Sequence, residues 1–143
     1  MAPEVPLELR LTLRAGTVYY FQHRELTSPE PHYFIVVNTD PLHDQVLLLA
    51  VASSKVANVR ERRRQMPAET VVEISPTEYA EFRVPTVVDC NRVFRKSLTE
   101  LIDDRKRGLV KPKNDLPREA LLRIQTGIKT SPLVEEEAKM LIK

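Results

Sequence analysis

The longest apolar run in the chain, Val46 to Ala52, limits the choice of fold more than any other segment. Its seven aliphatic residues match the length of a β-strand and fall far short of the 18 or so residues that cross a bilayer. A strand with no polar alternation is typical of a position buried on both faces of a sheet. We therefore expect a sheet that contains this strand, and no membrane protein.

Strand signals also occur before and after this run, in segments rich in β-branched and aromatic residues. The first segment follows Gly16, a natural turn residue, and the second leads through a short connection at Pro41 into the apolar run. We expect the second segment and the apolar run to form a central hairpin. The expected strands are Thr17–Gln22, His32–Asn38, Val46–Ala52, Thr70–Ile74, Thr86–Val88 and Val93–Phe94.

Four other segments have weaker signals. Leucines alternate with polar residues from Leu7 to Arg14, and this period of two predicts an edge strand. Prolines predict a loop from Glu25 to Pro31, and the loss of apolar periodicity from Ser53 to Glu69 predicts a second, long and exposed one. The capping box Ser75-Pro76-Thr77-Glu78 predicts a helix of one or two turns.

Helix boundaries are clearest in the last third of the chain. Ser97-Leu98-Thr99-Glu100 is a capping box, and the helix that it begins should end at Gly108 after a basic last turn. After a polar linker at 111–114, Asp115 can cap another helix, and Ser131-Pro132 can begin the last one. The core-facing positions of the middle helix are Leu121, Ile124 and Ile128.

Strands that come first and helices that come last favour an α+β fold, mainly β, with one strongly bent antiparallel sheet. The length of 143 residues suits one domain, with a barrel at about 7–97 and a helical part at about 98–143. The single cysteine, Cys90, excludes an internal disulfide, and three histidines provide no clustered zinc ligands. The N-terminus does not resemble a signal peptide, so we expect a cytoplasmic protein without a cofactor.

Four strand segments resemble, in the same order, the strands of the PemK/MazF family of toxins. They are 16–21, 32–37, 47–53 and 87–91. The resemblance extends to the helix that begins near Leu116, and so covers most of Gly16 to about Ile128. It implies an SH3-like small barrel, a homodimer, a bound antitoxin, and metal-independent cleavage of single-stranded RNA.

The resemblance also indicates where a ribonuclease site would lie. The family uses an arginine at the start of the second strand, a threonine or serine pair at the end of the third, and charged residues after the late strand. These places hold His32, Ala52-Ser53 and Asp89-Cys90-Asn91. Histidine titrates near neutrality, so His32 is the candidate acid or base, with Asp89 to orient it and Ser53 to help hold the phosphate.

The candidate binding residues lie next to these positions and are polar or basic. RNA cleavage without a metal needs a cation to offset charge on the phosphorane, and arginine both pairs with phosphate and stacks on bases. The arginines of 60–64 equally suit an acidic antitoxin segment or a solvated loop. The full set is Ser54, Lys55, Arg60, Arg62, Arg63, Arg64, Asn91 and Arg92.

Structural roles compete with each of these assignments. His32 can be an exposed histidine at a strand start, and Ser53 and Ser54 can serve the turn that follows their strand. We expect Cys90 to be buried and apolar in character.

Three functions follow. The first is a toxin-like endoribonuclease or a degenerate relative of one, and the alternative is a non-catalytic barrel that binds nucleic acid or a protein partner. A small-molecule enzyme ranks last, because the chain has three glycines and no glycine-rich phosphate loop.

Overall fold

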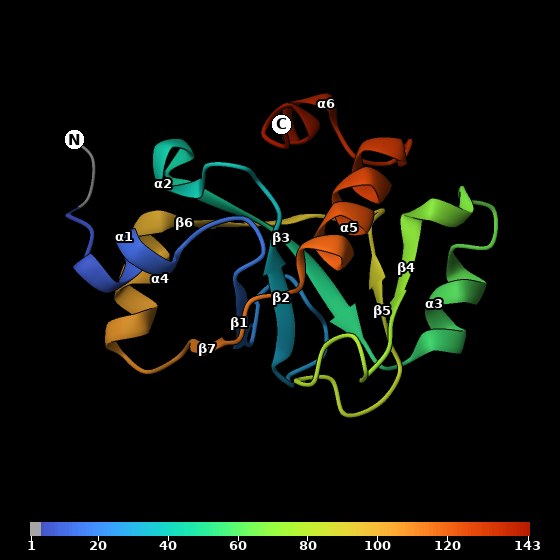
Figure 1. Ribbon diagram of the computed structural model, residues 1–143, viewed down its shortest axis with the longest axis horizontal. Helices are drawn as coiled ribbons and strands as arrows, with labels where there is room; N and C mark the ends of the chain where they lie inside the picture. Colours follow the sequence, from blue (N-terminus) through green and yellow to red (C-terminus); the bar gives the residue numbers. More distant parts are fainter. Residues whose placement is uncertain (1–3) are drawn as a thin grey trace.

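The computed structural model describes residues 4–143 and contains one sheet with helices around it (Figure 1). The strands are β1 (Val18–Phe21), β2 (His32–Val36), β3 (Val46–Ser53), β4 (Val71–Ile74), β5 (Thr86–Asp89), β6 (Phe94–Ser97) and β7 (Lys111–Lys113). The helices are α1 (Leu7–Thr12), α2 (Pro41–Asp44), α3 (Val56–Arg62), the 3₁₀ helix η1 (Ala68–Thr70), α4 (Leu98–Lys106), α5 (Arg118–Thr130) and α6 (Glu136–Met140).

β3 is the strand on which the sheet is built. The strand order is β4-β5-β3-β2-β1-β7, β6 also pairs with β3, and every pair is antiparallel. The first half of β3 pairs with β6 and its last two residues pair with β5, so the sheet bends along this one strand. The α+β class, mainly β and antiparallel, is confirmed. The sheet is not closed: within residues 4–143, β4 and β7 end the order and do not pair with each other.

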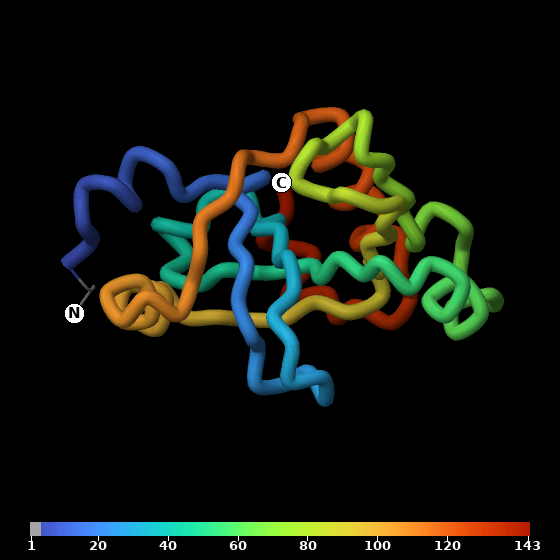
Figure 2. Tube along the Cα trace, turned by 90° about the horizontal axis from the view of Figure 1, so that it is seen from below, coloured from blue at the N-terminus to red at the C-terminus, as the bar shows by residue number. Residues whose placement is uncertain are grey.

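The core lies on both faces of β3, as the apolar run predicts. Leu48 and Ala50 belong to a cluster that α5 and α6 cover, whereas Leu47 and Leu49 belong to a second cluster under α1 and α4. Figures 1 and 2 show these two groups of helices on different sides of the sheet. The α5 positions predicted to face the core are all buried: Leu121, Ile124 and Ile128.

The N-terminal leucines form a helix, so the prediction of an edge strand at 7–14 is wrong. Leu9 and Leu13 are buried at 1% and 4% exposure, whereas Leu7 and Leu11 are exposed at 61% and 67%. Leucines that alternate with polar residues also include pairs four residues apart, such as Leu9 and Leu13. Residues with this spacing lie on the same face of a helix. Leucine is a strong helix former, and no β-branched residue precedes Thr12 in this segment.

The predicted long loop at 53–69 contains α3 and η1. Val59 is the one buried side chain of α3. A helix that buries a single residue has no apolar periodicity, which is why the sequence of this segment did not predict it. The predicted linker at 111–114 contains β7, which pairs with β1 at the edge of the sheet. Pro112 is compatible with this position because an edge strand has one side that needs no donor.

Two predicted helix starts are also corrected. α5 begins after Pro117 without a side-chain cap, and Asp115 instead pairs with Arg14 at 2.5 Å. The last helix begins at Glu136 rather than at Ser131-Pro132.

The two capping boxes differ in outcome. Ser75 and Glu78 form both hydrogen bonds of the capping box, each from one backbone amide to the other side chain. These bonds close a turn, and no helix follows it. At α4 the prediction is confirmed, because the Ser97 hydroxyl accepts from the Glu100 amide at 3.0 Å and Gly108 follows the helix at φ +72°. No helix within residues 4–143 is long and apolar enough to span a bilayer.

Candidate functional site

A cavity of about 360 Å³ lies where β2 begins, β3 ends and β5 begins. It brings together four of the predicted site residues, His32, Ser53, Ser54 and Lys55. The other walls come from β1, from the loop before β2 and from the turn before β5. Their side chains include Tyr20, Glu30, Pro31, Tyr33, Phe82, Arg83 and Thr86.

Strand register explains why His32 and Ser53 share this cavity. β2 and β3 pair Phe34 with Val51, so two residues farther along the same register His32 lies opposite Ser53. β3 and β5 pair Ser53 with Val87, which places Ser54 near Thr86. The histidine and the two serines therefore meet at one end of the sheet.

His32 has one ring nitrogen fixed and one available. Its Nδ1 lies 2.9 Å from the Glu30 carbonyl oxygen, which can only accept, so Nδ1 carries the proton and donates. In the neutral ring Nε2 then holds a lone pair. That nitrogen can accept a proton and later return it.

Ser53 serves the turn that follows its strand. Its hydroxyl oxygen accepts from the Lys55 amide at 3.1 Å, which is the structural role considered for it from the sequence. A hydroxyl has one donor and two acceptor sites, so this bond leaves its proton free to bind a ligand oxygen. Lys55 directs its exposed side chain from the same turn and lines the cavity.

The arginines of 60–64 are already paired with carboxylates. Arg60 contacts Glu73 at 2.5 Å, Arg64 contacts Glu61 at 2.6 Å, and Arg62 and Arg63 both contact Asp89. Within residues 4–143, no ion pair engages the two exposed cations at the cavity, Lys55 and Arg83. The arginines of 60–64 are therefore paired, whereas two cations without an ion pair line the cavity together with the carboxylates of Glu30 and Glu81.

Asp89 and Asn91 belong to a buried network. The Asp89 carboxylate accepts from Arg63 at 3.0 Å and from the Asn91 amide groups at 3.1 Å. Asn91 also donates to Thr70 and accepts from the Ser131 hydroxyl at 2.7 Å. Neither residue lines the cavity, so the structure does not bring Asp89 to His32.

Cys90 is fully buried in the core cluster under α5, as predicted. Burial raises the pKa of its thiol well above the usual range, which keeps it protonated and unreactive.

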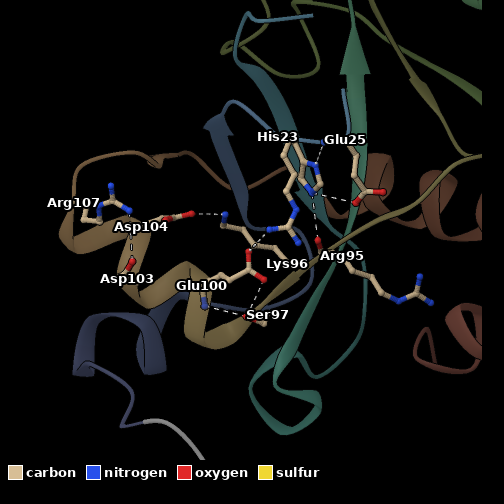
Figure 3. Close-up of polar contacts among 10 residues, drawn as sticks. His23, Glu25, Arg95, Lys96, Ser97, Glu100, Asp103, Asp104 and Arg107 are labelled. Carbon is tan, nitrogen blue, oxygen red and sulfur yellow. Dashed lines mark hydrogen bonds and ion pairs between the residues drawn. The ribbon is translucent and has the colours of Figure 1, made fainter. Parts of the chain in front are cut away.

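The loop from 22 to 31 contributes Ser28, Glu30 and Pro31 to the cavity wall. His23 fixes this loop through contacts with Glu25 and with Arg95 of β6 (Figure 3). The buried His23 ring accepts from the Glu25 amide at 3.1 Å and, through Nε2, donates to the Arg95 carbonyl at 3.3 Å. Arg92 donates to the Glu25 carbonyl at 3.3 Å while its guanidinium lies 4.4 Å from the Phe94 ring centroid. Arg92 is thus a support for the loop and does not line the cavity.

Sequence reasoning missed several residues of the cavity wall. Arg83 follows a turn that was predicted to be a helix. Tyr20 and Tyr33 were predicted only as residues of strands. Their common signal is position, since each lies at the same end of the sheet as His32. No group of three or more His, Cys, Asp or Glu residues within 4–143 is placed to hold a metal ion.

Comparison with known proteins gives a likeness of structure and none of sequence. No protein-family model and no curated protein matches the chain. A solved endoribonuclease from a mycobacterial species, in complex with its cognate antitoxin, superposes with a TM-score of 0.52 at 9% identity, over 87% of this chain and 96% of that one. The chain therefore has the fold of this antitoxin-bound endoribonuclease. The SH3-like barrel implied by the resemblance to the PemK/MazF toxins stays a prediction, since the sheet within residues 4–143 is open.

Proposed function

We propose that this chain is the toxin-like component of a toxin–antitoxin pair, acting in the cytoplasm as a metal-independent endoribonuclease on single-stranded RNA. One observation carries the proposal: a histidine with a free ring nitrogen, a serine hydroxyl and two unpaired cations share a cavity of about 360 Å³. The fold shared with an antitoxin-bound endoribonuclease supports it.

The proposed reaction uses the 2′-hydroxyl of the RNA as nucleophile. Nε2 of His32 accepts the proton of this hydroxyl, and its oxygen attacks the adjacent phosphorus. Lys55 and Arg83 offset the charge of the phosphorane, and Ser53 donates to a phosphate oxygen. The bond to the 5′-oxygen then breaks, that oxygen takes a proton from the Lys55 ammonium, and a 2′,3′-cyclic phosphate and a 5′-hydroxyl result.

Cleavage of a labelled single-stranded RNA in the presence of EDTA tests this function. His32→Ala should lower the rate by about 10²- to 10⁴-fold, the usual contribution of a general acid or base. His43→Ala is the matched control, because His43 is exposed on α2 and does not line the cavity. The same oligonucleotide with 2′-deoxy sugars should remain intact, because it lacks the 2′-hydroxyl nucleophile. Equal rates for His32→Ala and the wild type would remove His32 from the mechanism.

The second candidate function is a non-catalytic module that binds nucleic acid or a protein through the same cavity. It is favoured by the bond that the Ser53 hydroxyl already makes in its turn and by the finding that Asp89 does not line the cavity. Salt-dependent RNA binding without any cleavage would select this candidate.

We further propose a homodimer and an antitoxin partner. Sedimentation of the purified chain tests the dimer, and relief of growth arrest by a co-expressed neighbouring reading frame tests the partner. A monomer at all concentrations, or growth that no neighbour restores, would contradict them.

A further inference from the structure

A second hollow, of about 380 Å³, adjoins the candidate site. It lies between the end of β1 and the segment 108–111 that leads from α4 into β7. Tyr20 and Pro31 line both this hollow and the first cavity, so the two lie next to each other. Figure 2 shows β2, β1 and the β7 segment side by side in that order.

The second hollow exists because β7 leaves β1 early. The two strands pair only from Val18 to Tyr20, and β7 begins at Lys111 opposite Tyr20. Gly108, with a φ of +72°, lies between α4 and β7 and lines this hollow. Phe21 and Gln22 consequently have no strand partner on this side and form part of the wall.

Tyr20 stands at the junction with one aromatic neighbour and one cation. Its ring centroid lies 4.7 Å from that of Tyr33, and the Lys113 Nζ lies 5.6 Å from it. Both tyrosine rings are partly exposed. A partly exposed ring between two grooves is a surface on which a nucleobase can stack.

Unpaired positive charge continues past Tyr20. Lys111 is exposed in the second hollow and, within residues 4–143, takes part in no ion pair. The carboxylate of this hollow, Asp104, is neutralised by Lys96 at 2.6 Å. The first cavity is lined by two carboxylates, Glu30 and Glu81, and by two cations, Lys55 and Arg83, so its formal charges balance. The Glu81 carboxylate also accepts from the Asn114 amide at 2.9 Å.

We propose that the two hollows form one groove for a single RNA strand, with one base stacked on Tyr20 and the phosphate next to it bound by Lys111. The proposal rests on the proposed function, because the first cavity then holds the phosphate that is cut. It adds that the enzyme binds at least two successive nucleotides, one in each hollow. Alternating cations and an aromatic ring fit a strand of alternating phosphates and bases.

Binding of fluorescent 2′-O-methyl oligonucleotides of two, four and six residues tests the groove, because this RNA lacks the nucleophile and stays intact. Tyr20→Leu should weaken binding of the six-residue strand by about 5- to 150-fold, whereas Tyr20→Phe should retain most of it. Lys111→Gln should reduce the slope of the logarithm of the binding constant against the logarithm of salt concentration by about 0.7. Lys129→Gln, an exposed control on α5 outside both hollows, should bind as the wild type does.

The outcomes separate this proposal from the proposed function. If RNA is cut but Tyr20→Leu and Lys111→Gln bind like the wild type, the groove is wrong and the ribonuclease stands. If the wild type neither binds nor cuts RNA, both fail. If an acidic peptide binds in a Lys111-dependent way and RNA does not, the groove is a protein site and the RNA proposal is overturned. A melting curve of each variant confirms that it is folded, and Lys111→Gln tests the groove even if Tyr20→Leu does not fold.

Discussion

Gly127 lies in α5 where this helix packs against η1 and the turn after β5. A Cβ atom at this position would lie 2.6 Å from the Glu69 carbonyl oxygen and 2.9 Å from the Cys90 sulfur. Real Cβ atoms do not approach other atoms so closely, and a backbone carbonyl cannot move aside cheaply. This glycine is therefore required by close packing and not by its own dihedral angles.

Gly127→Ala should destabilise the fold by about 1–3 kcal/mol through overpacking, reduced by the roughly 1 kcal/mol that alanine gains in a helix. Urea unfolding followed by circular dichroism measures the difference. Thr126→Ala, at the neighbouring exposed position of α5, is the control and should leave stability unchanged or slightly higher. Equal stability of Gly127→Ala and the wild type would contradict the contact.

Tyr19 is 1% exposed, and within residues 4–143 its hydroxyl has no hydrogen-bond partner. Burial, opposed by the charge of Arg105, raises the pKa of Tyr19 to about 12 from a usual 10. The folded protein holds this proton more tightly than the unfolded chain, so its contribution to stability is complete below pH 10 and is lost as the pH rises through 12.

The wild type should consequently lose about 2 kcal/mol more than Tyr19→Phe between pH 9 and pH 12. At pH 7 the phenylalanine variant should be at least as stable, because it removes a buried hydroxyl that lacks a partner. Denaturant unfolding at both pH values measures this. Parallel pH profiles of the two proteins would show that Tyr19 ionises as freely when folded as when unfolded.

At this scale the sequence predicted part of the site. His32, Ser53, Ser54 and Lys55 share a cavity because strand register decides their position, and register follows from the apolar pattern. Asp89 could not be placed from the sequence, because its partner Arg63 is 26 residues away, directly after a helix without an apolar period. Which cations stay unpaired depends likewise on tertiary contacts.

The elements that were predicted correctly have local signals at both ends. α4 has a serine cap, a basic last turn and a glycine stop, and all three are used in the structure. α1 and β7 were missed because each is short and each owes its form to its neighbours. α1 is fixed by burial of Leu9 and Leu13, and β7 by pairing to β1.

Ser97→Ala should cost about 1 kcal/mol, because it leaves the Glu100 amide without its acceptor at the start of α4. Thermal or urea unfolding measures the loss. Ser75→Ala is a matched control, since Ser75 and Glu78 form the same box but close only a turn. Equal losses in the two variants would mean that the box stabilises the turn alone and not the helix.

The whole molecule is tied together by β3 and by the network around Asp89. β3 carries both apolar clusters, and the network links α3, η1, the turn after β5 and the segment after α5. The sequence predicted the first of these through its apolar run. It did not predict the second, because buried polar contacts between distant segments leave no periodic pattern.

Asp89→Ala should destabilise the protein by about 3–5 kcal/mol, because it leaves the guanidinium of Arg63 partly buried without a partner. Arg60→Ala removes an exposed pair with Glu73 and should cost no more than about 1 kcal/mol. Urea unfolding compares the two. A loss below 1 kcal/mol for Asp89→Ala, with RNA cleavage reduced per folded molecule, would return Asp89 to the catalytic residues.

The strands at the two ends of the sheet order, β7 and β4, differ in chemistry. β7, which reads Lys-Pro-Lys, lacks one amide donor and carries two cations, a combination that discourages the addition of another strand. β4 reads Val-Val-Glu-Ile and has no proline or lysine. Of these two edges, β4 is therefore the one at which another strand adds more readily, whether by orderly association or by aggregation of chains at high concentration. A proline or lysine placed on β4 is the change that would block it.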